Sequence, residues 1–223
     1  MAGKKDSPEA DRALATLCEM YWYPLYAFVR RQGYSSHDAQ DLTQGFFARL
    51  LQRDDLKGLD PRKGKFRAFL LASLKHFIAN EWDRTQTQKR GGGQTIIHLD
   101  AKTAEERYAL EPVDEMTPER LYERRWADTI LQQVFTRLRL ESDAAGKSQR
   151  FDELRPFLMD EPSADSYAEA ANRLGMTESA VKSAAHRMRQ RVGELLREEI
   201  GHTVADSREI DGEIRCLLAA LAA

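Results

Sequence analysis

The sequence has 223 residues, of which 42% are hydrophobic and 31% are charged, and its formal net charge is -2 at pH 7. A chain of this length can bury the core of one large domain or of two small ones. No apolar run approaches the roughly 20 residues that span a bilayer, and the charged N-terminus lacks the apolar stretch of a secretory signal. Two cysteines are too few for a disulfide framework or a zinc site. We therefore expect a soluble protein of the reducing cytoplasm, without membrane insertion.

The first predicted elements are helices, because nearly every periodic segment repeats its apolar residues about every 3.6 positions. Leu14, Leu17 and Tyr21 share one face of the first helix, and Pro24 is expected to interrupt or restart it. Residues 33–36 predict a turn, in which Ser36 or its neighbour caps the following helix. That second helix carries a broad apolar stripe up to residue 51.

A basic helix is predicted from Lys65 to Arg90, after a loop rich in glycine and proline. Its apolar residues recur at helical spacing and can bury one face. Between residues 62 and 90, eight Lys and Arg residues oppose only Glu81 and Asp83, although the whole chain is slightly acidic. A local basic segment in an acidic protein favours a phosphate backbone as partner. A solvated basic face is the alternative.

The chain changes character after the basic helix, where three glycines end the helical pattern. We predict an all-α fold of two small helical domains joined by a flexible linker, with a helix-turn-helix in the second domain. The boundaries are 8–90 for the first domain, 91–118 for the linker and 119–200 for the second domain. Thr117 and Pro118 are a typical helix start. Residues 201–223 form an amphipathic tail, expected to pack on the second domain or else on a partner.

A helix-turn-helix is predicted within Tyr167–Arg191. Ala171 permits a close helix crossing, Gly175 supplies the tight turn, and Val181 seats the second helix against the first. Side chains suited to phosphate or base edges lie on the second helix or cap it. These are Thr177, Ser179, Lys182, Ser183, His186, Arg187 and Arg189. The alternative is an ordinary helical hairpin with a solvated basic face.

Two separated segments together resemble one family. The first runs from Leu14 to Arg90 and includes DAQDLTQGFFARLL and FRAFLLASLKHFIANEWDR; the second is SYAEAANRLGMTESAVKSAAHRMRQRV, from Ser166 to Val192. Their order and spacing resemble a bacterial RNA polymerase sigma factor of the extracytoplasmic-function type, in the sigma-70 family. The resemblance covers roughly two-thirds of the chain.

The resemblance implies a transcription initiation factor whose partners are core RNA polymerase and promoter DNA. The helix from Asp38 to Leu51 would dock on the clamp helices of the largest polymerase subunit, through Asp38, Asp41, Gln44, Phe46, Phe47 and Arg49. The basic helix and its preceding loop would hold the separated strand of the minus-ten element, through Lys63, Lys65, Arg67, Lys75, His76, Asn80 and Arg84. The helix-turn-helix would read the minus-thirty-five element as duplex DNA.

The docking segment departs from the family pattern Asp-Ala-Glu-Asp-Leu-Val-Gln-Glu, because this chain has Gln40, Thr43 and Gly45. Two acidic groups are missing. One hypothesis is that a Ser/Thr kinase phosphorylates Thr43 and restores roughly two negative charges there. An anti-sigma protein, a kinase or the C-terminal tail are alternative regulators.

Three other function classes were weighed. The sequence has no nucleophile–base arrangement, metal-spaced cluster or phosphate-binding glycine loop, so we expect neither an enzyme nor a cofactor or metal. A stand-alone helix-turn-helix regulator would bind duplex operator without polymerase. An adaptor would contact polymerase but would have lost promoter recognition. Core-polymerase binding and promoter-specific initiation separate these three from a sigma factor.

Overall fold

The structure is a computed structural model that describes residues 8–52, 65–87, 101–111, 116–158, 164–204 and 206–222. Within these ranges every regular element is a helix, which confirms the all-α prediction. The elements are α1 (Pro8–Arg31), α2 (Ser36–Gln52), α3 (Phe66–Thr87), α4 (Ala101–Tyr108), α5 (Pro118–Ala144), α6 (Ser148–Leu154), η3 (Arg155–Leu158), α7 (Ala164–Leu174), α8 (Glu178–Gly201), η4 (Ser207–Glu209) and α9 (Ile210–Ala222). No helix of the described part is long and apolar enough to cross a bilayer.

Helix α1 differs from the sequence prediction, because Pro24 lies inside it and does not end it. Proline removes one backbone donor and usually bends a helix rather than stopping it when tertiary contacts hold both sides. Here the residues on both sides of Pro24, from Met20 to Val29, are buried. The side chain of Ser35 accepts a hydrogen bond from the Asp38 amide at 3.1 Å. Of the two predicted candidates, Ser36 or its neighbour, it is therefore the neighbour Ser35 that caps α2.

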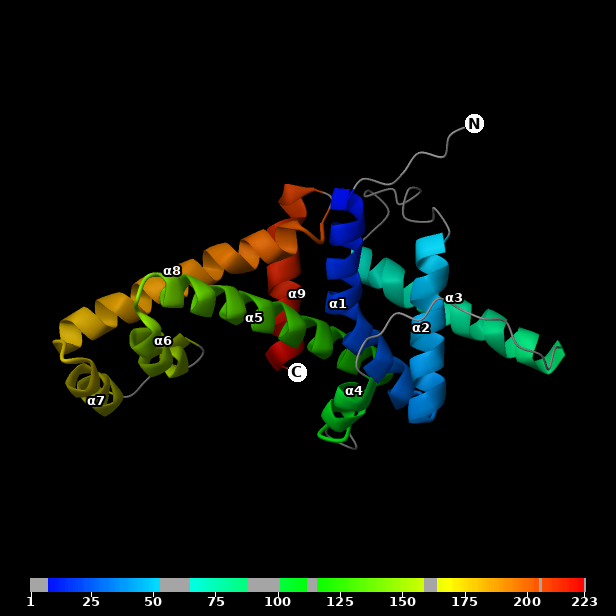
Figure 1. Ribbon diagram of the computed structural model, residues 1–223, viewed down its shortest axis with the longest axis horizontal. Coiled ribbons are helices and arrows are strands. Elements are labelled where there is room, and N and C mark those ends of the chain that lie inside the picture. The colour runs from blue at the N-terminus through cyan, green and yellow to red at the C-terminus, as the bar shows by residue number, and fades with distance from the viewer. Residues whose placement is uncertain are drawn as a thin grey trace.

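Helix α5 is the central element of the fold. Thr117 caps it as predicted, since its side chain accepts from the Arg120 amide, and Pro118 occupies the first turn. It packs against α1, α8 and α9, and Figure 1 shows it running beside α8 and crossed by α9. The largest buried side chain is Trp126 of α5. One apolar core therefore joins α1, α2 and α3 to α5, α8 and α9.

A second, smaller core lies at the opposite end of the molecule from α2 and α3 (Figure 1). It joins α6, η3, α7 and the first half of α8 through residues that include Leu154, Ala171 and Val181. Ala184 and Ala185 of α8 belong to this core and are buried. Their small side chains allow α8 to approach α7 and η3 closely.

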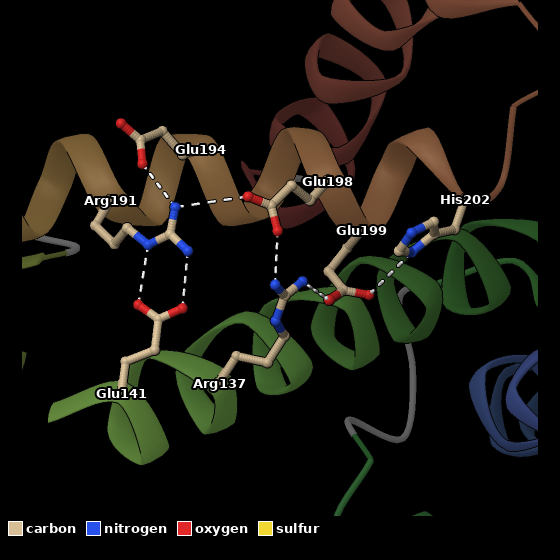
Figure 2. A network of polar contacts seen from close by, with 7 residues as sticks. All are labelled: Arg137, Glu141, Arg191, Glu194, Glu198, Glu199 and His202. Carbon is tan, nitrogen blue, oxygen red and sulfur yellow. Dashed lines mark hydrogen bonds and ion pairs between the residues drawn. The ribbon is translucent and has the colours of Figure 1, made fainter. Parts of the chain in front are cut away.

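Ion pairs link α5 to the second half of α8 (Figure 2). Arg137 donates to Glu198 and Glu199, each at 2.6 Å. Arg191 donates to Glu141 at 2.8 and 2.9 Å, which lowers the pKa of the Glu141 carboxyl below its usual value. Because these side chains are partly exposed, each pair stabilises the fold only modestly, and the buried apolar contacts hold the two helices together.

The predicted linker, 91–118, contains a docked helix. Residues 101–108 form α4, and Glu105 accepts hydrogen bonds from Arg30 at 2.8 and 3.0 Å and from Tyr26. These contacts lower the pKa of the Glu105 carboxyl, the Arg30 bond most strongly. Residues 88–100 and 112–115 lie outside the described residues. The division into two domains stays a prediction, and the two predicted domains share the larger core.

Candidate nucleic-acid interface and docking helix

Helix α2 presents polar side chains on one face and buries aromatic ones on the other. Asp38 and Asp41 are exposed, and Gln44 and Arg49 are half-buried. Phe46 and Phe47 are only 3% and 2% exposed, and the Phe46 ring packs edge-on against Phe77 of α3. The prediction that these two aromatics contact polymerase does not fit, because they form the core between α2 and α3. Sequence spacing alone did not separate the two faces.

Thr43 is also buried, with 0% of its surface exposed. Its hydroxyl donates to the Ala39 carbonyl oxygen at 2.7 Å, within the same helix. A kinase needs an extended, accessible segment, so the predicted phosphorylation at Thr43 does not fit this structure. The small hydroxyl is tolerated there because its one donor is satisfied.

The basic helix α3 divides its predicted DNA-binding residues into two groups. His76 and Asn80 are exposed, whereas Lys65, Arg67 and Lys75 are engaged by carboxylates from other helices. Lys63 lies outside the described residues, and Arg84 lies in α3 with its side chain outside the described part. Among the described members of this set, His76 and Asn80 are exposed, Arg67 is buried and paired, and Lys65 and Lys75 are paired at partly exposed positions.

Arg67 is the most enclosed of these cations, with 6% of its surface exposed. Its Nε donates to Glu213 Oε2 at 2.8 Å, and its guanidinium also pairs with Glu123. The guanidinium lies over the ring of Trp126, 4.5 Å from the centroid. The prediction that Arg67 binds single-stranded DNA does not fit this conformation, because three neighbours occupy the group.

Lys65 and Lys75 are paired at the edges of the same face. Lys65 Nζ lies 2.5 Å from Glu213 Oε1 and 3.0 Å from Cys216 Sγ. Burial lowers the pKa of Lys65, but hydrogen bonds to Glu213 and Cys216 outweigh it, so the pKa lies above its ordinary value. Lys75 Nζ donates to Glu119 at 2.7 Å, and this bond is the main reason that the pKa of Glu119 is lowered. Lys65 and Lys75 are therefore both held by carboxylates from other helices.

The acidic partners were not found by sequence reasoning. Glu119 and Glu123 lie in the first turns of α5, and Glu213 lies in α9. No pattern in the sequence relates them to α3, since Glu213 is 146 residues from Arg67. The only local signal was a charged residue on the apolar side of the predicted tail helix.

Helices α7 and α8 are joined by the predicted tight turn. Gly175 has a φ of 61°, and the Met176 amide donates to the Ala171 carbonyl at 2.9 Å. Thr177 caps α8 as predicted, since its hydroxyl accepts from the Ala180 amide at 3.2 Å. Val181 is fully buried against α7. The local geometry of this segment follows its sequence.

The exposed face of α8 carries most of the residues predicted to bind duplex DNA. Ser179, Lys182, Ser183, His186 and Arg187 are exposed. Arg189 is different, because it is half-buried and its Nε donates to the Phe157 carbonyl oxygen at 3.0 Å. Its role in this structure is to hold η3 against α8.

A shallow groove of about 260 Å³ adjoins this face and brings in cations that the sequence analysis did not select. Lys147, the N-cap of α6, and Arg150, within α6, line it together with Arg187. These residues precede α8 by more than one element, so only the tertiary packing of α6 and α8, both of which contact α5, brings them together. Among the described residues, no three His, Cys, Asp or Glu side chains could hold a metal ion.

Replacing Gly175 with alanine should destabilise the chain by about 1–2 kcal/mol, because a Cβ is unfavourable at positive φ. The matched control is Gly193→Ala in α8, which has open space around it and should stabilise by about 0.5–1 kcal/mol. Urea unfolding of both variants measures the difference. Equal effects would mean that the turn does not adopt this conformation in solution.

Residues 17–88 match the family model described as Sigma-70 region 2. The matched segment includes all of α2 and α3 and most of α1, and it therefore contains the candidate docking helix and the basic helix. No curated protein and no solved structure matches the chain.

Proposed function

We propose that this chain is a sigma-70 family sigma factor, a transcription initiation factor that binds core RNA polymerase and directs it to promoters. The match of residues 17–88 to Sigma-70 region 2 is the observation that carries this proposal. Region 2 contains the principal polymerase contact of such factors. In this chain, the exposed acids Asp38 and Asp41 of α2 are the groups we assign to that contact.

We assign the chain more finely to the extracytoplasmic-function type. Support comes from the second helical segment, α7 and α8, which follows region 2 after a spacer. In this proposal α8 lies in the major groove of the minus-thirty-five element, with Lys182, His186 and Arg187 toward the DNA. The opposite placement of the α2–α3 and α6–α7 ends suits two separate promoter contacts (Figure 1).

We assign the minus-ten contact to α3. Among the described side chains of α3, His76, Asn80 and Lys75 are exposed, and Lys65 lies just before the helix. Single strands are bound by cationic grooves and by capture of bases on aromatic or polar side chains. For this contact, phosphates of the DNA strand would have to replace Glu213 and Glu119 as partners of the two lysines.

In vitro transcription with purified core RNA polymerase tests the proposal. The chain should comigrate with core enzyme and start transcripts at defined sites. Asp38→Ala combined with Asp41→Ala should weaken comigration, whereas removal of Glu194 and Glu169, two exposed acids far from α2, should not. Binding to a duplex operator with no affinity for core enzyme would identify a stand-alone regulator and overturn the proposal.

Arg187→Ala should reduce binding to the promoter duplex by about 5- to 150-fold, corresponding to about 1–3 kcal/mol for a bidentate base contact. Arg197→Ala is the matched control, because Arg197 lies on the same helix and pairs with Asp211, away from the predicted DNA face. Fluorescence anisotropy on promoter and scrambled duplexes measures both. An equal loss on the two duplexes would assign Arg187 to a phosphate instead.

A further inference from the structure

The C-terminal helix α9 brings a carboxylate into contact with the basic helix. Glu213 is 2% exposed and lies against both Lys65, the residue before α3, and Arg67 of α3. Cys216, one turn further along α9, accepts a hydrogen bond from the same lysine. Glu213 and Cys216, which lie one turn apart on α9, therefore both contact side chains at the N-terminal end of α3.

Apolar residues hold α9 in place beside this contact. Leu217 is fully buried, and Ile210, Ile214 and Leu221 pack against the larger core. Helix α9 contacts α5 and α8 through this face (Figure 1). An apolar side chain at position 213 would serve that docking at least as well, since a buried carboxylate must give up its hydration. The charge at Glu213 is thus explained by its partners on α3 and not by the docking of α9.

Two further carboxylates, from another helix, also pair with cations of the basic segment. Glu123 pairs with Arg67 and Glu119 pairs with Lys75, both from the start of α5. Three cations of the basic segment are in this way paired with three carboxylates from outside region 2. Carboxylate oxygens occupy the positions at which phosphate oxygens would bind the same cations.

We infer that α9 is a built-in inhibitor, in which Glu213 occupies Lys65 and Arg67 and withholds them from nucleic acid until α9 undocks. The inference rests on the proposed function in one respect, namely that the ligand of α3 is a single DNA strand. Phosphates of the strand compete with the carboxylate, so strand binding and α9 docking exclude each other. The tail of the chain thereby keeps the free protein from binding DNA strands without a promoter.

Binding of a single-stranded oligonucleotide to the full-length chain, in the absence of polymerase, tests the inference. Glu213→Gln should strengthen binding severalfold at about 0.1 M salt, because Lys65 loses its carboxylate partner, whereas Arg67 keeps Glu123. The plot of log K against log salt should become steeper by about 0.7, the value for one phosphate contact on a single strand, here made by Lys65. The matched control is Asp211→Asn, which removes one negative charge from the same helix at a residue paired with Arg197 of α8.

The reactivity of Cys216 reports undocking without reference to DNA affinity or transcription. In a Cys18→Ser background, Cys216 is the remaining thiol of the sequence, and it is half-buried against Lys65. Its alkylation rate should rise severalfold in Glu213→Gln and stay unchanged in Asp211→Asn. Adding the oligonucleotide to the Cys18→Ser chain should also raise the alkylation rate of Cys216. This measurement requires no substitution in α9.

Glu213→Gln and Asp211→Asn with the same affinity and the same alkylation rate would overturn the inference. Faster alkylation in Glu213→Gln without stronger strand binding would also overturn it, because the released cations would then not serve DNA. Neither result depends on core polymerase, so the sigma-factor proposal would stand. Conversely, failure to bind core polymerase would remove that proposal and leave the strand-binding results valid.

Discussion

Trp126→Ala is expected to lower the free energy of unfolding by about 3–5 kcal/mol, the range for deleting a large aromatic from a packed core. Trp126 is 0% exposed and has the largest volume among the fully buried side chains. It lies on α5 at the point where the core joins α1 to α5, and it also carries the Arg67 guanidinium on its face. Removing it leaves a cavity and takes away a partner of a buried cation at once.

Urea unfolding followed by far-UV circular dichroism measures this loss. Leu140→Ala is the matched control, because Leu140 lies on the same helix and is 62% exposed. The control should change stability by no more than about 0.5 kcal/mol. A similar small loss for both variants would show that α1 and α5 do not share this core in solution.

Arg67→Ala is expected to cost about 3–5 kcal/mol, because it leaves a buried carboxylate without its main partner. Glu213 would keep only Lys65, and its side chain is 3% exposed. The Tyr122 hydroxyl, which donates to the Arg67 carbonyl oxygen at 2.9 Å, stays bonded, because that acceptor belongs to the backbone. The loss therefore measures the side-chain contacts alone.

A compensated variant separates charge from packing. Arg67→Met combined with Glu213→Leu keeps similar volumes and removes both charges, so it should recover most of the lost stability. Arg197→Ala, which breaks an exposed pair with Asp211, should cost at most about 1 kcal/mol. An Arg67→Ala variant as stable as the Arg197→Ala variant would mean that the Arg67–Glu213 pair does not form in solution.

Short-range features could be predicted from the sequence. The helix start at Thr117, the cap at Thr177 and the tight turn at Gly175 were expected, because each depends on residues within one helical turn. The all-helical class followed from the apolar period. The prediction that Pro24 interrupts the first helix was wrong. Buried contacts on both sides of the proline stabilise a continuous helix at a residue that usually ends one.

The candidate site was predicted less completely than the fold. Residue type placed Lys65, Arg67 and Lys75 on a basic helix, but it did not show that all three are paired. Phe46, Phe47 and Thr43 lie on a helix whose surface was expected to bind polymerase, yet all three are buried where α2 packs against α1 and α3. An amphipathic repeat identifies an apolar stripe, whereas its exact edges depend on the neighbouring helix.

The sequence alone determines the local structure of this protein, because helix periods, helix caps and the glycine turn depend on residues only a few positions apart. The contact of Glu213 with Arg67 joins residues 146 positions apart, and no propensity or spacing rule reaches that far. It exists because α5 packs on α1, and α9 in turn packs on α5 and α8. Charge pairing between distant helices follows from that packing. The carboxylates that pair with the cations of the basic segment could therefore be identified only from the tertiary structure.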